Sequence, residues 1–268
     1  MTDLTDAAGT VHRPVTRAPR IVSLVPSITE LVCELGLAEN LVGRTGFCVH
    51  PREKLRRIPK VGGTKTVDLA RLRDLAPTHV IVNVDENLRE TAAAIAACVP
   101  NLVVTHPLAP LDNTGLYRLI GGIFRREQEA EHLSGEFLAC YDALAAAHLA
   151  VPRRRVLYLI WKKPWMTVSR DTYISRTLAL VGLDTVPSES AVRYPEISLE
   201  DAVRDADSVL LSSEPYRFRE KDVAGLRAIP ALAGKKIALV DGEMTSWYGP
   251  RAIAGLRYLA GLRRRLDH

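Results

Sequence analysis

The chain has 268 residues, 47% of them hydrophobic and 25% charged, an ordinary composition for a globular protein with one large domain or two small ones. Its formal charge of +5 is spread thinly, and its densest basic runs (residues 52–60, 153–155 and 263–265) contain no aromatic residues. We therefore interpret these runs as solvated faces and expect no nucleic-acid partner. The four cysteines have no paired spacing, which argues against a disulfide framework or a structural zinc site.

The N-terminal residues 1–19 contain neither an apolar run nor a secretory signal. They are predicted to form a flexible polar tail. No stretch of the chain approaches the roughly 18 uninterrupted apolar residues of a transmembrane helix, so no membrane insertion is expected. As written, the sequence predicts a cytoplasmic protein.

The segment 20–110 alternates short apolar runs with amphipathic stretches, which predicts an N-terminal α/β lobe. Strands are expected at residues 20–25, 41–44, 79–83 and 102–105, and helices after Pro26 and at residues 68–75 and 88–98. Ser27 is the expected N-cap of the first helix, with Glu30 completing a capping box. Because the strands are continuously apolar, we expect a parallel sheet covered by helices on both faces.

The next segment, 111–150, is predicted to be a helical spine. From Ala130 to His148 apolar residues recur in steps of three and four, which indicates a helix over 126–148, about 35 Å long. A shorter helix precedes it, capped by Asp112 or Asn113 and loosened by the glycine pair at 121–122. The alternative is one ordinary surface helix. The repeat that follows favours a spine.

The segment 151–268 repeats the order of the first lobe, with strands expected at residues 155–160, 209–212 and 237–240 and helices at 172–182 and after Ser198. Two pairs of short matches share an offset of 130 residues, including Val99-Pro100 and Ile229-Pro230. The predicted fold is therefore α/β, with two parallel-sheet lobes joined by a long rigid backbone helix and a ligand cleft between the lobes.

Ligands of open parallel sheets bind beyond the carboxyl ends of the strands, so the loops at those ends supply the candidate ligand-binding residues. In the first half these are Ser27, Phe47, Cys48, His50, Thr64, Asn83 and Glu86. In the second half they are Trp161, Trp165, Tyr194, Glu214, Tyr216, Glu243, Trp247, Tyr248 and Arg251.

All three tryptophans lie in these loops, which favours a lining role in a concave site over the alternative of loop packing. For Trp247→Ala we accordingly expect weaker ligand binding at a nearly unchanged thermal midpoint.

The sequence contains no Walker loop, no nucleophile elbow and no HExxH motif. Cys48 and His50 alternate by two and would point the same way in an extended loop. They could form half of a metal or metal-chelate site, with Glu86, Glu214 or Glu243 as oxygen donors. A histidine that only packs in its loop is the alternative.

The stretches RIVSLVPSITELVCELGL, VGRTGFCVHP, VGGTKTVDLARLRDLAPTHVIV and SWYGPR resemble the class III substrate-binding proteins of ABC importers. Within that class they look most like the cobalamin-binding protein-like, or helical-backbone metal receptor, group. The resemblance implies a cobalamin, siderophore or haem ligand between two lobes and export from the cytoplasm. It also implies acidic residues that dock to a permease, with Glu34, Glu90 and Glu189 as candidates.

The resulting hypothesis is a binding protein without catalysis that reversibly holds a cobalt- or iron-containing chelate and has no intrinsic cofactor. Its expected partners are the small-molecule ligand and an ABC permease, and we expect a monomer. The alternatives are a cytosolic metabolite sensor, or a chelatase-like enzyme on the same scaffold in which His50 or Glu243 handles protons.

Overall fold

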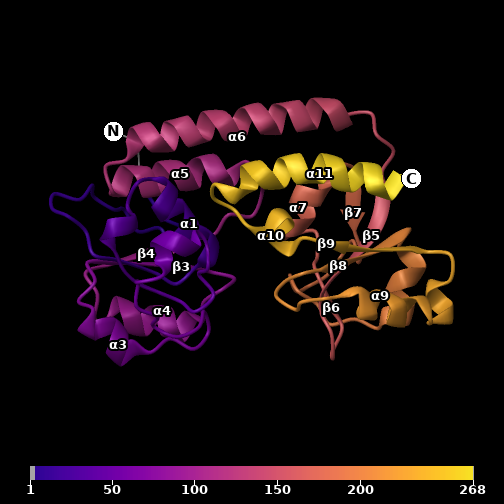
Figure 1. Cartoon of the computed structure of the whole chain (residues 1–268), viewed down its shortest axis with the longest axis horizontal. Coiled ribbons are helices and arrows are strands. Elements are labelled where there is room, and N and C mark those ends of the chain that lie inside the picture. Colours follow the sequence, from indigo (N-terminus) through magenta and orange to yellow (C-terminus); the bar gives the residue numbers. More distant parts are fainter. Residues whose placement is uncertain (1–3, 268) are drawn as a thin grey trace. The chain divides into compact units, whose positions relative to one another are not determined.

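The computed structural model describes residues 4–267, which form two compact units (Figure 1). The first unit contains the residues up to Pro107, Leu111–Glu136 and Tyr248–Pro250; the second contains Leu108–Pro110, Phe137–Trp247 and the residues from Arg251 onward. In these units, residues 111–136 of the expected spine and the short segment Tyr248–Pro250 belong to the first unit, whereas the sequence placed the latter in the second lobe.

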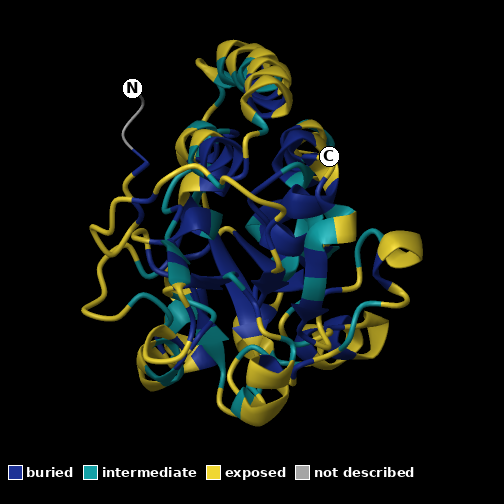
Figure 2. Cartoon of the chain, turned by 90° about the vertical axis from the view of Figure 1, so that its left-hand side faces the viewer, coloured by how far each residue is buried: buried dark blue, intermediate teal, exposed yellow. Residues whose placement is uncertain are grey.

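The first unit is built on a parallel sheet in the order β2-β1-β3-β4. The strands lie close to their predicted places: β1 (Ile21–Ser23), β2 (Leu41–Arg44), β3 (His79–Asn83) and β4 (Asn101–Thr105). Val22 and Val80 pack on Leu72 and Ile95 from two helices on one face of the sheet. Ile81 points to the opposite face because side chains alternate along a strand, and it is also fully buried. Figure 2 colours most strand residues as buried.

The helices of the first unit are α1 (Pro26–Glu34), α2 (Arg52–Leu55), α3 (Leu69–Asp74), α4 (Arg89–Ala96) and α5 (Asp112–Ile123), with a 3₁₀ turn η1 (Ala38–Asn40). Asp68 caps α3 by accepting a hydrogen bond from the Arg71 amide at 3.0 Å. The capping box predicted for α1 is wrong, because Val25 is the N-cap residue and Pro26 occupies the first helical turn. Proline is favoured in the first turn of a helix, because N–H groups there have no intrahelical acceptor and proline has no N–H to leave unsatisfied.

The predicted N-terminal tail is a second correction. From Leu4 the chain packs against the first unit, and Leu4, Asp6 and His12 are all less than 9% exposed. The amide of Ala7 donates to the Val104 carbonyl at 2.9 Å, and an Asp6 carboxylate oxygen accepts from the Val104 amide at 2.9 Å. This segment therefore covers the edge of β4. Residues 1–3, also part of the predicted tail, lie outside the described residues.

The expected long helix is confirmed as α6 (Glu127–His148), which begins in the first unit and ends in the second. The glycines at the end of α5 do not loosen that helix as predicted. A Cβ on Gly121 would lie 2.5 Å from the Cβ of Ala130, so glycine is needed for the close approach of α5 and α6. Neither Asp112 nor Asn113 caps α5, because Leu111 is its N-cap residue. Asn113 lies inside the helix, and its side-chain oxygen accepts from the Gly249 amide at 2.7 Å.

The second unit repeats the strand order of the first. Its strands are β5 (Arg154–Trp161), β6 (Met166–Thr167), β7 (Leu183–Thr185), β8 (Ser208–Ser212) and β9 (Lys236–Val240). The parallel strands β7-β5-β8-β9 have the same order as β2-β1-β3-β4, and the short antiparallel strand β6 is added beside β5. This shared order is the structural counterpart of the repeat seen in the sequence.

The helices of the second unit are α7 (Tyr173–Ala179), α8 (Leu199–Ala202), α9 (Glu220–Arg227), α10 (Gly242–Ser246) and α11 (Arg251–Asp267), with 3₁₀ turns η2 (Val203–Asp205) and η3 (Pro230–Leu232). Their core side chains, such as Val203 and Val223, pack on Leu157 and Leu211 of the sheet. The interpretation of residues 263–265 as a solvated face is wrong for Arg263, which is 2% exposed.

Between Leu4 and Asp267 no helix has the length and hydropathy of a membrane span.

Candidate functional site

In both sheets the chain crosses over between two central strands, β1 and β3 in the first unit and β5 and β8 in the second. Loops at the carboxyl ends of such a pair diverge and leave space for a ligand. The candidate residues predicted from sequence follow these central strands or the other parallel strands of each sheet, and the two units are described in turn.

In the second unit, the loops after β5 and β8 carry a cluster of four aromatic side chains. The ring of Trp161 packs edge-on against the ring of Tyr216, with 5.6 Å between the ring centres. The ring centres of Tyr216 and Phe218 are 4.6 Å apart. The Tyr216 amide donates to the Ile160 carbonyl at 3.2 Å, which ties one loop to the end of the other strand. Trp161 remains 39% exposed and presents aromatic surface to solvent. Trp165 instead stacks on Phe218 and packs on the core.

The carboxylate of Glu214, in the loop after β8, is held by two hydrogen bonds. Its Oε1 atom accepts hydrogen bonds from Ser246 Oγ at 2.9 Å and from Trp247 Nε1 at 2.6 Å. Burial raises the pKa of Glu214 above its usual value, and the negative charges of Glu243 and Asp241 act in the same direction, against the two hydrogen bonds. Trp247 is only 8% exposed, so it packs the loop and positions Glu214.

We predict that Glu214 makes the stability of the protein depend on pH. A carboxyl whose folded-state pKa is raised stabilises the fold at low pH, and this contribution is lost as the pH rises from the ordinary value of 4.5 through the folded-state pKa. Glu214→Gln keeps an acceptor oxygen and removes the titration. The stability of the wild type relative to Glu214→Gln should therefore fall between pH 4.5 and pH 7 in urea unfolding. An unchanged difference across this range would contradict the prediction.

Three other predicted residues of the second unit are held by neighbouring side chains. Arg251 pairs with Glu243 at 3.1 Å, and its guanidinium lies 5.0 Å from the centre of the Trp247 ring. Tyr194 is half-buried, with the guanidinium of Arg193 5.7 Å from the centre of its ring. These contacts fix the side chains before any ligand arrives.

Tyr248 was predicted in a loop of the second lobe, but it belongs to the first unit. Its hydroxyl donates to Glu86 Oε1 at 2.5 Å, and it is 7% exposed. Burial and the adjacent Glu86 carboxylate raise the pKa of Tyr248 well above its usual value. Ser27, near Tyr248, is also buried. The tyrosine is therefore a neutral hydrogen-bond donor that orients Glu86.

The remaining predicted residues of the first unit divide into structural and exposed groups. Asn83 is buried, and its side-chain oxygen accepts from the Asp85 amide at 2.8 Å, so it shapes the turn after β3. The carbonyl of Thr64 accepts from the Asn87 side chain at 2.8 Å, which connects two loops. Phe47 is 63% exposed and offers an aromatic surface at the end of β2.

The structure does not bring Cys48 and His50 together as an accessible metal-binding pair. Cys48 is fully buried, its sulfur lies 3.0 Å from Thr29 Oγ1 and 3.1 Å from Thr45 Oγ1, and burial raises the pKa of its thiol. His50 is half-buried. Across residues 4–267 there is no group of three or more His, Cys, Asp or Glu side chains arranged to hold a metal ion. The segment before Cys48 is not extended, because Gly46 and Phe47 form a turn that the Cys48 amide closes on the Thr45 carbonyl at 3.3 Å. The metal site at Cys48 and His50 stays a prediction.

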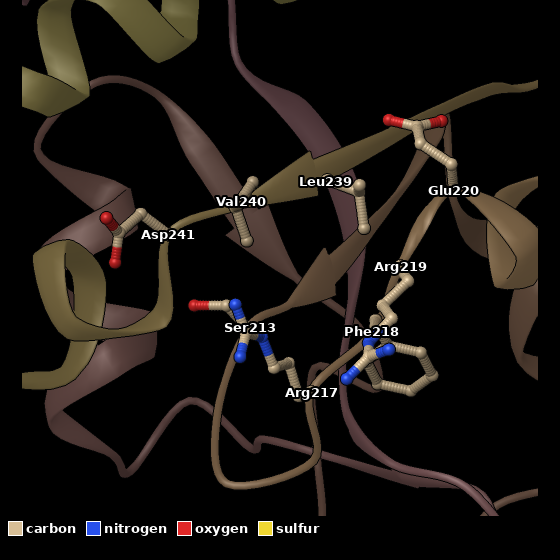
Figure 3. A pocket seen from close by; sticks show the side chains of 8 residues that line it. All are labelled: Ser213, Arg217, Phe218, Arg219, Glu220, Leu239, Val240 and Asp241. Carbon is tan, nitrogen blue, oxygen red and sulfur yellow. The ribbon is translucent and has the colours of Figure 1, made fainter.

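Sequence reasoning missed an open pocket of about 650 Å³ at the carboxyl ends of β8 and β9 (Figure 3). None of the predicted site residues lines it. Its walls combine an apolar surface with two arginines and two acidic residues: Ser213, Arg217, Phe218, Arg219, Glu220, Leu239, Val240 and Asp241. Two arginines in the short loop before a helix were the available signal.

Two α/β units of the same strand order, with a long helix running from one into the other, define the class of two-lobed solute-binding proteins. Residues 21–241 match the family model described as periplasmic binding protein, so the chain belongs to this family. The resemblance noted from the sequence motifs is thereby confirmed.

Relatives within and around this family include binding proteins for two kinds of ligand. A vitamin B12-binding protein of Pectobacterium atrosepticum is 24% identical over 192 residues, which cover 69% of this chain and 68% of the relative. The solved periplasmic vitamin B12-binding protein of Vibrio cholerae matches with a TM-score of 0.80 at 16% identity, over 93% of this chain and 98% of that one.

A periplasmic haem-binding protein of Roseiflexus sp. RS-1 also has a TM-score of 0.80, at 24% identity, over 94% of this chain and 100% of that one. At these identities, both solved structures show the fold alone. The family is one of binding proteins that serve transport, and its periplasmic character gives the expected cytoplasmic location no support.

Proposed function

We propose that this chain is the substrate-binding protein of an ABC importer, and that it reversibly binds a metal chelate of the cobalamin, haem or siderophore class without catalysis. The vitamin B12-binding relatives and the fold shared with a haem-binding protein support the ligand class. The protein would act outside the cytoplasm and deliver its ligand to a permease, with Glu34, Glu90 and Glu189, all exposed, as candidate docking residues.

The observation that carries this proposal is the accessible ring of Trp161 on a rigid support. Binding sites for small molecules combine aromatic surface with a few fixed polar groups and are largely formed before the ligand binds. Trp161 supplies the aromatic surface, while Glu214 is fixed by hydrogen bonds from Ser246 and Trp247. Phe47 gives the first unit an exposed ring of the same kind.

The chelatase-like alternative is less well supported by the geometry. Glu243, one of its two proton-handling candidates, is engaged in an ion pair with Arg251 at 3.1 Å. The Glu243 carboxylate is therefore already paired within the protein. Reversible binding without turnover is the function that remains favoured.

The deciding experiment is a titration of the purified protein with cyanocobalamin, hemin and ferrichrome, followed by tryptophan fluorescence. Native mass spectrometry then measures the stoichiometry and the mass of the released ligand. We expect saturable binding of one ligand class and recovery of that ligand unchanged. Failure of all three to bind, or chemical conversion of the bound ligand, would contradict the proposal.

We predict that Trp161→Ala weakens binding of that ligand at least tenfold, which corresponds to about 1.4 kcal/mol. A central aromatic contact commonly contributes this much or more. Because the side chain is 39% exposed, the free energy of unfolding should change by no more than about 1 kcal/mol. Trp161→Phe is the matched control and should retain most of the affinity. Equal affinity of Trp161→Ala and the wild type would remove Trp161 from the site.

A further inference from the structure

The net charge of the protein is concentrated in one segment of the first unit, residues 52–74. This segment contains eight cations (Arg52, Lys54, Arg56, Arg57, Lys60, Lys65, Arg71 and Arg73) and three anions (Glu53, Asp68 and Asp74). Taking them from the 36 Lys and Arg and the 31 Asp and Glu of the chain leaves 28 of each. The whole formal charge of +5 therefore belongs to these 23 residues, and the rest of the chain is balanced.

The segment forms a continuous layer along the edge strand β2 and over one face of the sheet. The Arg44 amide of β2 donates to the Pro59 carbonyl at 3.0 Å, and the Val61 amide donates to the Arg44 carbonyl at 2.8 Å. The Asp68 amide donates to the Val61 carbonyl at 2.9 Å, which fixes the start of α3 beside this strand. Leu72 of α3 packs in the core with Val61.

The positive charge of this layer is not neutralised by the fold. All eight cations are exposed, and none makes an ion pair with any residue between 4 and 267. Lys54 donates to a backbone carbonyl, that of Cys33, at 3.4 Å. Of the three anions, Asp68 caps α3 by accepting from the Arg71 amide.

The basic run at residues 153–155 shows the opposite behaviour. Each of its arginines pairs with an aspartate of the second unit: Arg153 with Asp184, Arg154 with Asp267, and Arg155 with Asp205 and Asp207. Like charges gathered without such partners repel one another, and an external anionic surface relieves that repulsion. Of these two runs, the segment 52–74 is thus the one that offers its charge to a partner.

The character of the segment favours a lipid surface as that partner. It contains no aromatic residue on which a nucleic-acid base could stack. Its cations are long, flexible side chains spread over α2, a loop and α3, which suits a fluid array of phosphate headgroups better than one fixed arrangement of carboxylates. Clusters of about this many Lys and Arg residues hold proteins at bilayers that contain anionic lipids.

We propose that the surface formed by residues 52–74 binds the headgroups of anionic phospholipids and holds the protein reversibly at the bilayer. The choice of a lipid surface rests on the proposed function, because the binding protein of an importer works beside a membrane. Lys54 reaches the carbonyl of Cys33 at the end of α1, where Glu34 is a candidate residue for docking to the permease. Docking through Glu34 would therefore bring the basic layer close to the lipids around the permease.

The test is co-sedimentation of the full chain with vesicles made of equal parts phosphatidylglycerol and phosphatidylcholine. We expect binding to these vesicles and none to vesicles of phosphatidylcholine alone. Raising the NaCl concentration from about 0.05 M to about 0.5 M should release the protein, because salt at the higher concentration screens charges beyond a few ångströms. Inorganic phosphate should release it no better than NaCl of equal ionic strength.

Charge reversal locates the surface. The double variant Arg56→Glu/Arg57→Glu should weaken vesicle binding at least tenfold without lowering the thermal midpoint, because both side chains are exposed. Arg227→Glu/Arg257→Glu is the matched control, since it changes the net charge equally at two exposed positions of the second unit. It should weaken binding less than threefold.

Four results would overturn the proposal. They are equal binding to both kinds of vesicle, equal losses in the two double variants, selective release by inorganic phosphate, and tighter binding to soluble polyglutamate than to the vesicles. The last would identify an acidic polypeptide as the partner. The vesicles contain neither permease nor metal chelate, so failure here leaves the ligand titration unaffected, and failure of that titration leaves vesicle binding standing.

Discussion

Arg263→Ala should lower the free energy of unfolding by about 3–5 kcal/mol, because it removes a buried guanidinium that donates hydrogen bonds to backbone carbonyl groups. The guanidinium donates to the carbonyls of Val181 at 2.9 Å and Pro152 at 2.8 Å, and it pairs with Asp267 at 3.0 Å. Its removal leaves the two carbonyls without this donor, while Asp267 keeps its ion pair with Arg154 at 2.9 Å. It also opens a cavity between α11 and the segments that flank β5 and β7.

Thermal unfolding measures this effect, and a loss of this size corresponds to a decrease in Tm of about 10 °C for a protein of this length. Arg264→Ala is the matched control. Because Arg264 is exposed, this substitution should change the free energy of unfolding by less than about 0.5 kcal/mol. Similar behaviour of the two variants would show that Arg263 does not hold the second unit together.

Trp247→Ala should destabilise the protein by about 3–5 kcal/mol, the usual cost of removing a large buried aromatic side chain. This expectation reverses the one drawn from sequence, which placed the ring in a ligand-lining position. The side chain is 8% exposed, its Nε1 donates to Glu214 at 2.6 Å, and Arg251 covers its ring. The variant therefore loses packing and frees a confined carboxylate.

Urea unfolding of Trp247→Ala, measured beside Trp161→Ala, separates the two tryptophans. The first should lose stability, and the second should lose ligand affinity while it keeps its stability. If Trp247→Ala unfolded at the same urea concentration as the wild type, the packing role assigned to Trp247 would be wrong.

The alternating arrangement of strands and helices was predictable because it depends on local patterns. The apolar run at residues 79–83 and the three-and-four spacing along α6 each determine an element from its own residues. The weak matches at an offset of 130 residues were enough to predict two units with the same strand order. The family followed from the same motifs.

The candidate site was only partly predictable, because exposure of a loop side chain depends on neighbours far away in sequence. Trp161 ends β5 and Trp247 follows α10, both among polar neighbours in sequence, yet Trp161 is accessible and Trp247 is covered by Glu214 and Arg251. Cys48 follows Phe47 directly, but only Phe47 faces solvent, because the Cys48 side chain points towards Thr29 and Thr45.

The element order, the two-unit repeat, the long helix and the family can be predicted from sequence alone, since each is encoded in periodicity or in short contiguous motifs. Which arginine is buried, which tryptophan is accessible and which sheet edge is covered depend instead on long-range contacts. Arg263 meets Val181 and Pro152, and Asp6 meets Val104, across about 80 to 110 residues of chain. Contacts over such separations arise only when the whole chain has folded, because no local pattern specifies which distant carbonyl or amide a side chain will reach.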